Sequence, residues 1–362
     1  MLPAGDRLLL GPGPSPVSKR VLAALSAAPR SHLDPDLVAL LDDIRARLGR
    51  VFRASDGALS LAISGTGTSG MEATVANLAE SGRKALVIVT GYFGVRLAEI
   101  LTRYGAEVDR IEVEWGRAVD PEVVARALET RKYDLVAIVH AETSTGVRNP
   151  VAEVAAMARA HDALVIVDAV TSLGAMPVEV AEWYVDACFS CTQKGLGAPS
   201  GLAPVTFSRR ALERRVRCRS FAFDLGLLEA YWIDRKYHHT ISAPLIYALA
   251  AALAEVESEG LEERWRRHQE VHDQFAARLT AANLSLLPPP AERSWSVYAV
   301  VVPDDVDEAE VRRTLLVRHN IEIGAGLGPL AGRIWRVGLM GSGATAENVA
   351  AVMQALADAR GQ

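Results

Sequence analysis

A series of short, almost wholly apolar segments sets the narrowest limits on how this chain can fold. The segments at 85–89, 135–139 and 164–167 contain only Ala, Val, Leu and Ile, and helical patterns separate them. Strands without alternating polar residues are buried on both faces, which occurs where helices cover both sides of a parallel sheet. The sequence therefore predicts an α/β fold with a mostly parallel sheet.

The order of the predicted elements divides the chain into three parts. Residues 1–16 are expected to form an extended N-terminal arm, because glycines and prolines interrupt the apolar run that begins at Leu8. Residues 17–259 form the large domain, and residues 260–362 form a smaller α+β domain that starts with an amphipathic helix over 261–279. Further helices are expected at 35–52, 71–78, 94–104, 121–128, 151–160, 244–257, 308–317 and 346–359, and further strands at 59–63, 108–113, 297–302 and 334–339.

Composition argues against several classes of protein. The 362 residues carry a net charge of −5 and the pI is near 6.0, which disfavours an electrostatic nucleic-acid or membrane partner. No apolar run approaches the length of a membrane-spanning helix, and the N-terminus lacks the pattern of a secretory signal. Cys188, Cys191 and Cys218 form no disulfide framework, and nothing completes a zinc site with the first two. We therefore expect a cytoplasmic protein without a bound metal.

A glycine-rich loop lies between a predicted strand and a predicted helix. Gly65, Gly67 and Gly70 have the spacing of a dinucleotide-binding loop, but the next strand ends at Val89 without the acidic residue that would hold a ribose. The same loop could bind a single phosphate, because free N–H groups and the helix dipole favour an anion at a helix N-terminus. A loop that is merely tightly packed is the third alternative.

Lys194 is the only charged residue between Ala187 and Ser208. Its neighbours are small residues and glycines, so burial would lower the pKa of its amine. A buried amine of this kind is suited to act as a nucleophile and to form a Schiff base with a carbonyl compound. The alternative is an ordinary lysine on a surface loop.

Polar and aromatic residues follow the ends of the predicted parallel strands, where α/β proteins bind their ligands. Asp168, Thr143 and Phe93 each follow one of these strands, although Asp168 alone could equally cap a turn. Together with Lys194 and the glycine loop they supply a carboxylate, a hydroxyl, an aromatic face, an amine and a phosphate site. Pyridoxal phosphate requires this set, because it binds a lysine, an acid at its pyridinium nitrogen, phosphate donors and a flat apolar cover.

Seven stretches of sequence, in one order across almost the whole chain, carry a resemblance to a known family. They are Leu-Leu-Leu-Gly-Pro-Gly-Pro-Ser (8–15), Ile-Ser-Gly-Thr-Gly-Thr (63–68), His-Ala-Glu-Thr-Ser-Thr-Gly-Val (140–147), Val-Asp-Ala-Val-Thr-Ser-Leu-Gly (167–174), Thr-Gln-Lys-Gly-Leu-Gly-Ala-Pro-Ser-Gly (192–201), Tyr-His-His-Thr-Ile (237–241) and Ile-Trp-Arg-Val-Gly (334–338). The chain resembles the class V aminotransferases of fold type I, and among them the alanine–glyoxylate and serine–pyruvate aminotransferases. This resemblance implies a mostly parallel sheet of the seven-stranded type flanked by helices, with a smaller C-terminal α+β domain.

The resemblance implies a role for each matching residue. Lys194 would hold pyridoxal 5'-phosphate as a Schiff base and later move the proton between the substrate Cα and the cofactor. Asp168 would pair with the pyridinium nitrogen, Phe93 would stack on the ring and Thr143 would lie near the ring hydroxyl. The phosphate would be held by Thr66, Gly67, Thr68 and Gln193. Many relatives carry Trp in place of Phe93, so a smaller stacking surface is expected here. Some relatives carry His in place of Thr68, so the phosphate contact at this position differs within the family.

The same resemblance implies a neighbouring subunit and a substrate contact. Tyr237 and Thr240 would reach the cofactor phosphate of the other subunit, which makes a homodimer necessary for a complete site. Arg336 would bind the substrate carboxylate, because a guanidinium matches its two oxygens better than an ammonium does. A salt bridge on a small-domain strand is the alternative for Arg336. Gly13, in the first matching stretch, would lie at the substrate.

The implied activity is transfer of the amino group of a small amino acid, alanine or serine, to a small 2-oxo acid by ping-pong chemistry. Glyoxylate is the expected acceptor, with pyruvate second. Ureidoglycine–glyoxylate and 2-aminoethylphosphonate–pyruvate transamination are alternatives on the same scaffold. A cysteine desulfurase is more distant, because no cysteine follows Cys218 to act as its nucleophile. An NAD-dependent oxidoreductase is the most remote alternative, because only the glycine loop supports it.

Overall fold

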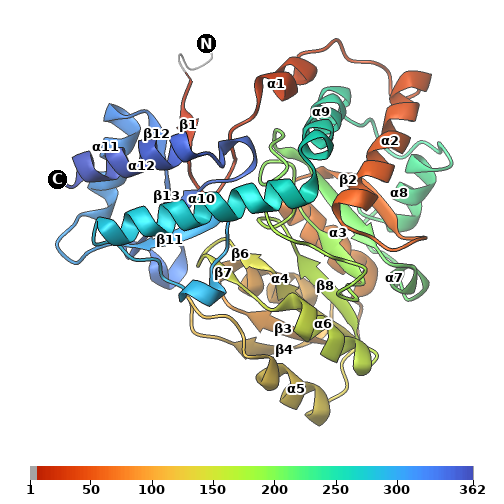
Figure 1. The fold of residues 1–362 in the computed structure, drawn as a ribbon. Helices are drawn as coiled ribbons and strands as arrows, with labels where there is room; N and C mark the ends of the chain where they lie inside the picture. Colours follow the sequence, from red (N-terminus) through yellow and green to blue (C-terminus); the bar gives the residue numbers. More distant parts are fainter. Residues whose placement is uncertain (1–5, 362) are drawn as a thin grey trace.

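A computed structural model describes residues 6–361, and a seven-stranded sheet lies at its centre (Figure 1). The strands of this sheet are β2 (Leu59–Gly65), β3 (Lys84–Val89), β4 (Glu107–Glu112), β5 (Leu135–Val139), β8 (Leu164–Asp168), β9 (Ala187–Phe189) and β10 (Gly201–Phe207). Their order in space is β2-β10-β9-β8-β5-β3-β4. Neighbours pair in parallel except at β10, which is antiparallel to both β2 and β9. The predicted α/β class and the mostly parallel sheet are confirmed.

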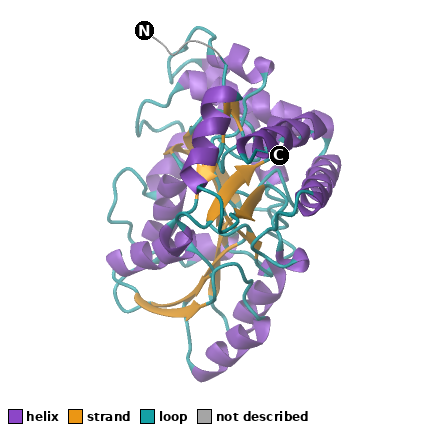
Figure 2. Ribbon diagram, turned by 90° about the vertical axis from the view of Figure 1, so that its left-hand side faces the viewer, coloured by secondary structure: helices purple, strands orange, loops and turns teal. Residues whose placement is uncertain are grey.

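Helices cover both faces of this sheet, as its apolar strands require (Figure 2). α3 (Gly67–Leu78) contacts α4 (Tyr92–Arg103), and α5 (Pro121–Thr130) contacts α6 (Val151–Ala160). Right-handed crossovers between the parallel strands put these two pairs on opposite faces. The strands β5 and β8, which lie between the two helix layers, are buried along their whole length.

The remaining helices of the large sheet gather near the edge formed by β2 and β10. α2 (Pro35–Val51) contacts both strands and also α9 (Ala243–Glu259), on which α1 (Lys19–Leu25) packs. Two shorter helices, α7 (Arg209–Glu213) and α8 (Leu225–Trp232), follow β10 in the chain. Beyond β5, the two-residue strands β6 (Ala141–Glu142) and β7 (Val147–Arg148) form a small antiparallel hairpin.

Polar N-caps and first-turn prolines determine where two of these helices begin. Asp34 and Asp120 accept hydrogen bonds from backbone amides two residues further on, at 2.9 and 3.0 Å. Pro35 and Pro121 follow them, and a proline suits the first turn because an amide there would have no partner within the helix. Both helices start where the sequence predicts.

The C-terminal part of the chain has its own sheet. β11 (Val297–Val301), β14 (Ile334–Gly338) and β13 (Gly324–Ala325) pair antiparallel in that order. The helices α11 (Glu308–Arg318) and α12 (Ala346–Ala359) pack on each other beside it. The predicted alternation of strands and helices in this part of the chain is therefore present.

Two segments connect the parts of the molecule. α10 (Leu261–Ala281) continues from α9 and extends across to the C-terminal sheet (Figure 1). The strand β1 (Leu8–Leu9), within the segment predicted as an extended arm, pairs in parallel with β12 (Ile321–Glu322). Leu10 belongs to the C-terminal hydrophobic cluster, which shares no residue with the cluster around the large sheet. The domain boundary at residue 260 stays a prediction, which these separate clusters support.

The sequence prediction omits β10 and starts α3 too late. Pro204 lies inside β10, and a proline is unusual in the interior of a sheet. The strand still pairs with its neighbour, because the Pro204 carbonyl accepts a hydrogen bond from the Ser190 amide at 2.8 Å. α3 begins at Gly67, immediately after Thr66, so most of the glycine loop is the first turn of the helix.

Candidate active site

The carboxyl ends of the parallel strands meet at one edge of the large sheet, where a cavity of about 150 Å³ lies. The predicted residues that follow these strands all line it: Thr66, Gly67, Thr68, Phe93, Thr143, Asp168, Gln193 and Lys194. The lining is completed by Met71, Arg96, Val170 and Cys191. Sequence positions more than a hundred residues apart are thus brought to one site.

The N-terminus of α3 forms one wall of the cavity. The Thr66 amide donates to Ser69 Oγ at 3.2 Å. The next amides, those of Gly67 and Thr68, have no partners within the helix because they belong to its first turn. A Cβ on Gly67 would lie 3.0 Å from a methyl group of Val170, so this backbone closely approaches the cavity. A helix N-terminus with free amides is what the predicted phosphate site requires, and the binding role of this wall stays a prediction.

Lys194 lies in the loop between β9 and β10, with its side chain mostly enclosed. Its Nζ donates to the carbonyl oxygen of Pro12, and Ser15 Oγ donates to the Lys194 carbonyl at 2.9 Å. Burial lowers the pKa of the amine, and the Arg336 cation acts in the same direction. Gly13 (φ +112°) packs against this side chain so closely that a Cβ there would overlap Lys194 Nζ. The N-terminal segment therefore forms part of the lysine's surroundings.

Asp168 is the last residue of β8 and is buried. Its Oδ1 accepts a hydrogen bond from the Val170 amide at 2.8 Å, the only hydrogen bond that residues 6–361 make to this carboxylate. The pKa of Asp168 is raised to about 7, chiefly by burial and also by the nearby Glu142 carboxylate, whereas the Val170 amide, Lys194 and Arg96 oppose this rise. A cationic ring nitrogen beside Asp168 would favour its ionised form.

Thr143 reaches the cavity from the turn of the β6–β7 hairpin. The prediction that it directly ends an apolar strand is wrong, because β5 stops at Val139 and the hairpin follows. The Thr171 hydroxyl donates to the Ala141 carbonyl at 2.6 Å, so the Thr143 hydroxyl, 3.1 Å from that of Thr171, is the donor of this pair. The hairpin carries Thr143 further from the sheet than a strand end would.

Arg96 is the charged lining residue that sequence reasoning missed. Its guanidinium lies 5.0 Å from the ring centroid of Phe93 and donates to Thr68 Oγ1 at 3.1 Å. In the sequence, an arginine within an amphipathic helix is interpreted as a charged residue on the protein surface. The sequence feature that could have identified Arg96 is its position three residues after Phe93, which puts both side chains on one face of α4.

The chemistry of the cavity fits pyridoxal phosphate. Gln193 Oε1 is buried and has no hydrogen-bond partner among the described residues, so this acceptor is free for a donor group of a ligand. Asp168 offers a second carboxylate oxygen, and Lys194 offers an amine with a lowered pKa. With the amides at the start of α3, these groups match the phosphate, the ring nitrogen and the aldehyde of that cofactor.

Arg336 lies on β14, across from the hairpin. Its Nε donates to the Ala325 carbonyl at 2.6 Å, and a terminal nitrogen lies 3.5 Å from the Thr143 carbonyl. Burial lowers its pKa to about 10, which Glu142 partly opposes. Within residues 6–361 no carboxylate forms a salt bridge with it, so the alternative of a strand salt bridge is not observed.

Tyr237 and Thr240 do not line the cavity of the single chain. Their hydroxyl oxygens lie 3.5 Å apart, and Tyr237 is 66% exposed. The structure therefore does not bring this predicted pair to its own site.

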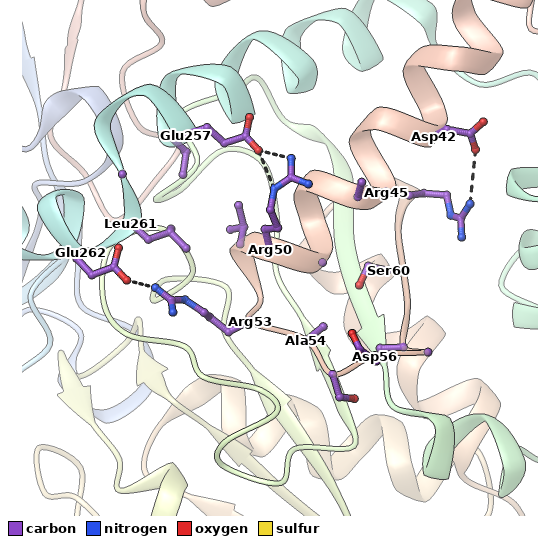
Figure 3. A pocket seen from close by; sticks show the side chains of 18 residues that line it. Asp42, Arg45, Arg50, Arg53, Ala54, Asp56, Ser60, Glu257, Leu261 and Glu262 are labelled. Carbon is purple, nitrogen blue, oxygen red and sulfur yellow. Dashed lines mark hydrogen bonds and ion pairs between the residues drawn. The ribbon is translucent and has the colours of Figure 1, made fainter.

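A larger hollow, of about 810 Å³, lies elsewhere, between the end of α2 and the junction of α9 with α10 (Figure 3). None of the predicted site residues lines it. Six of its seven charged lining residues form the ion pairs Arg50–Glu257, Arg53–Glu262 and Arg45–Asp42, and Asp56 is the seventh. The hollow contains neither the lysine nor the other residues predicted to bind the cofactor, so we place the chemistry at the sheet edge.

The fold and the cavity together define a pyridoxal-phosphate-dependent enzyme of fold type I. Residues 9–337 match the family model described as Aminotransferase class-V. The chain is 36% identical over 364 residues to an alanine–glyoxylate aminotransferase of Drosophila melanogaster, covering 98% of this chain and 92% of that protein. The chain therefore belongs to the class V aminotransferase family, as the sequence motifs predict.

Two solved structures are similar over almost the whole chain. An alanine–glyoxylate aminotransferase from Nostoc sp. has a TM-score of 0.97 and 44% identity, covering 99% of this chain and 96% of that chain. A ureidoglycine–glyoxylate aminotransferase from Bacillus subtilis has a TM-score of 0.96 and 37% identity, covering 99% and 94%. The enzyme class and the cofactor predicted from the sequence are confirmed.

Proposed function

We propose that this enzyme moves the amino group of alanine or serine to a small 2-oxo acid, with glyoxylate preferred and pyruvate second. The observation that carries the proposal is the position of Arg336. Its guanidinium has no carboxylate partner among the described residues, and it lies near enough to Lys194 to lower the pKa of the amine. A substrate carboxylate held there would place its amino group near Lys194. The names of the similar alanine–glyoxylate aminotransferases support alanine as donor and glyoxylate as acceptor.

The residues of the cavity divide the work of the reaction. Pyridoxal phosphate, when bound, supplies the aldehyde that takes up the amino group and a ring that accepts electrons. The neutral amine of Lys194 would take a proton from the substrate Cα and deliver it to the cofactor carbon that carries the amino group, because its lowered pKa favours the unprotonated form. Asp168 holds a proton on the ring nitrogen. The start of α3, with Thr66, Thr68 and Gln193, binds the phosphate, and Phe93 covers the ring.

A panel of half-reactions tests the donor. Purified holoenzyme is mixed with one amino acid at a time, without an acceptor, and the loss of its yellow absorbance is recorded. Alanine and serine are expected to bleach the enzyme, whereas aspartate and valine serve as controls of different charge and shape. If alanine and serine both fail, the proposed donor is wrong, while the family and the cofactor stand.

A ureidoglycine donor is the second candidate, because the Bacillus subtilis relative is named for it. Both candidates share glyoxylate as acceptor, so only the donor separates them. Bleaching by ureidoglycine that is much faster than bleaching by alanine would favour this second function.

We further propose that the enzyme is a homodimer in which Tyr237 and Thr240 contact the phosphate in the neighbouring subunit. The exposed Tyr237 has no role in its own cavity. Other large apolar side chains are exposed on or next to α8 and on the segment before α2. They are Phe221, Leu227 and Ile233 at α8, and Leu33 before α2. A second copy of the chain would cover this surface. The mass in solution, from sedimentation, tests the assembly.

The cellular compartment and the remaining alternative activities are considered last. Within residues 6–361 no helix is both long and apolar enough to cross a membrane. The cytoplasmic location stays a prediction from the cysteine content. Neither desulfurase nor NAD-dependent chemistry has support beyond the features given above, and a colourless protein that binds NADH would favour the latter.

A further inference from the structure

The helix α4 begins at the cofactor cavity without a side-chain cap of its own. Its N-cap residue is Gly91, which has no side chain to accept a hydrogen bond. The amides of Tyr92, Phe93 and Gly94 therefore need acceptors from elsewhere, because the first amides of an α-helix have no partner within it.

Those acceptors come from the β6–β7 hairpin, 48 to 52 positions further along the chain. Ser144 Oγ accepts from the Tyr92 amide at 2.9 Å. The two carboxylate oxygens of Glu142 accept from the Phe93 amide at 3.4 Å and the Gly94 amide at 3.2 Å. The Ser144 hydroxyl donates to Glu142 at 2.6 Å, which locks the two side chains together. The hairpin thus satisfies all three amides.

Gly91 leaves the space that this arrangement requires. A Cβ at that position would overlap both the Ser144 hydroxyl and the Glu142 side chain. Its φ of 168° is ordinary extended backbone, so the requirement for glycine is one of space and not of backbone conformation.

Glu142 is completely buried, and a buried carboxylate is costly unless donors surround it. Burial raises the pKa of Glu142, whereas the hydrogen bonds from Ser144, Gly94 and Phe93 oppose this. The positive end of the helix dipole also favours its charge. Its negative charge acts to raise the pKa of Asp168, which lines the cavity, and of Arg336 on β14.

We propose that Glu142 is a positioning residue which, together with Ser144, holds the first turn of α4 so that Phe93 and Arg96 face the cofactor. The proposal rests on the cofactor site described above and not on the identity of the amino donor. The same hairpin carries Thr143, so one short segment sets two walls of the cavity.

Glu142→Gln tests this proposal. The amide keeps the size of the side chain but has one acceptor oxygen and no charge, so at least one α4 amide loses its partner. We expect the cofactor-free protein to bind pyridoxal phosphate at least about tenfold more weakly, as for the loss of a hydrogen bond to a charged group. At saturating cofactor, the visible circular dichroism of the bound cofactor should also decrease, because it reports the orientation of the ring.

Asp307→Ala is the control, because alanine removes the side-chain cap of another helix whereas asparagine would keep it. Asp307 caps α11 in the C-terminal part by accepting from Ala309 and Glu310 at 2.9 and 3.0 Å. Its loss should lower the melting temperature but leave the dissociation constant of the cofactor within about twofold. This separates the effect of losing any helix cap from an effect on the cofactor.

Ser144→Ala decides the question if the Glu142 variant does not fold, because it removes only one hydroxyl. It should weaken cofactor binding in the same direction and reduce the visible dichroism. Cofactor affinity within about twofold of wild type, with unchanged dichroism, would overturn the proposal. Failure of the amino-donor panel with the wild-type enzyme would leave this result untouched, so the two proposals fail separately.

Discussion

The amine of Lys194 donates a hydrogen bond to the carbonyl oxygen of Pro12, a residue 182 positions earlier in the chain. This contact holds the N-terminal segment against the reactive lysine. The adjacent Gly13 leaves no room for a side chain between them. The position of the lysine thus depends on a segment far from its own loop.

Gly13→Ala should displace the Lys194 side chain and reduce the amount of covalently held cofactor. Its φ of +112° also disfavours any residue with a Cβ, at about 1–3 kcal/mol. The measurement is the cofactor fixed by borohydride, together with the melting temperature. Gly82→Ala is the control, since Gly82 has a φ of +89° and nothing within 4 Å of its added Cβ. Equal loss of cofactor in both variants would contradict the proposed packing.

Lys194→Ala should abolish turnover, because it removes both the covalent link to the cofactor and the group that moves the proton. The loss of the proton-transfer function alone is expected to lower kcat by roughly 10²- to 10⁴-fold. Lys84→Ala, at the start of β3 and outside the cavity, is the control. Near-normal transamination by the Lys194 variant would show that this assignment is wrong.

The raised pKa of Asp168 predicts a pH-dependent stability of the cofactor-free protein. Its pKa is about 7 in the folded protein and about 3.9 in an unfolded chain. Between these values the folded state binds more protons, so the contribution of Asp168 to stability is lost as the pH rises from about 4 to about 7. Asp168→Asn removes this titration, and the variant should gain stability relative to wild type over that range.

Urea unfolding of both cofactor-free proteins at about pH 5 and about pH 8 measures this difference. Burial lowers the pKa of His140 and His268 to about 3, and these groups are common to both proteins and cancel in the comparison. Glu142 raises the pKa of Asp168, so its own titration contributes to the measured difference. A difference in unfolding free energy that does not change with pH would contradict the prediction.

Arg336→Lys should weaken binding of every carboxylate substrate. A lysine keeps the charge but loses the two parallel donors, so we expect KM for both amino acid and oxo acid to rise by roughly 10- to 100-fold. The kcat should change less, because Arg336 does not touch the reacting bond. Arg333→Lys, exposed at the residue before β14, is the control. A fall in kcat without a change in KM would argue against a carboxylate contact.

Mixed dimers test whether Tyr237 acts on the neighbouring subunit. Lys194→Ala and Tyr237→Ala chains are each expected to form poorly active homodimers. A heterodimer of the two contains one site with both residues intact, so co-expression should restore activity to about half of a wild-type dimer at most. Activity no higher than the sum of the two homodimers would indicate that Tyr237 acts within its own chain or not at all.

The sequence predicted which segments are strands better than it predicted which strands lie side by side in the sheet. The apolar runs at β5 and β8 are unmistakable, because burial on both faces removes every polar residue. The strand β10 escaped prediction, since Pro204 interrupts its apolar pattern and its pairing depends on two strands distant in the chain.

The residues of the active site also divide into those that the sequence predicts and those that depend on neighbours distant in the chain. Asp168 and Lys194 could be predicted, because each follows a strand whose carboxyl end lies at the ligand edge. Arg96 and the capping role of Glu142 could not. Glu142 meets α4 only because β5 lies beside β3 in the sheet, and no local spacing in the sequence encodes that neighbour relation.

The parallel pairing of Leu8 with Ile321 has a consequence for the order in which the molecule is made. During synthesis, the segment that carries Pro12 and Gly13 has no strand to pair with until β12 has left the ribosome. A growing chain can complete its large sheet while this segment is still unpaired. The lysine therefore acquires its final surroundings only when nearly all of the polypeptide exists, and a truncated chain would lack an activated amine.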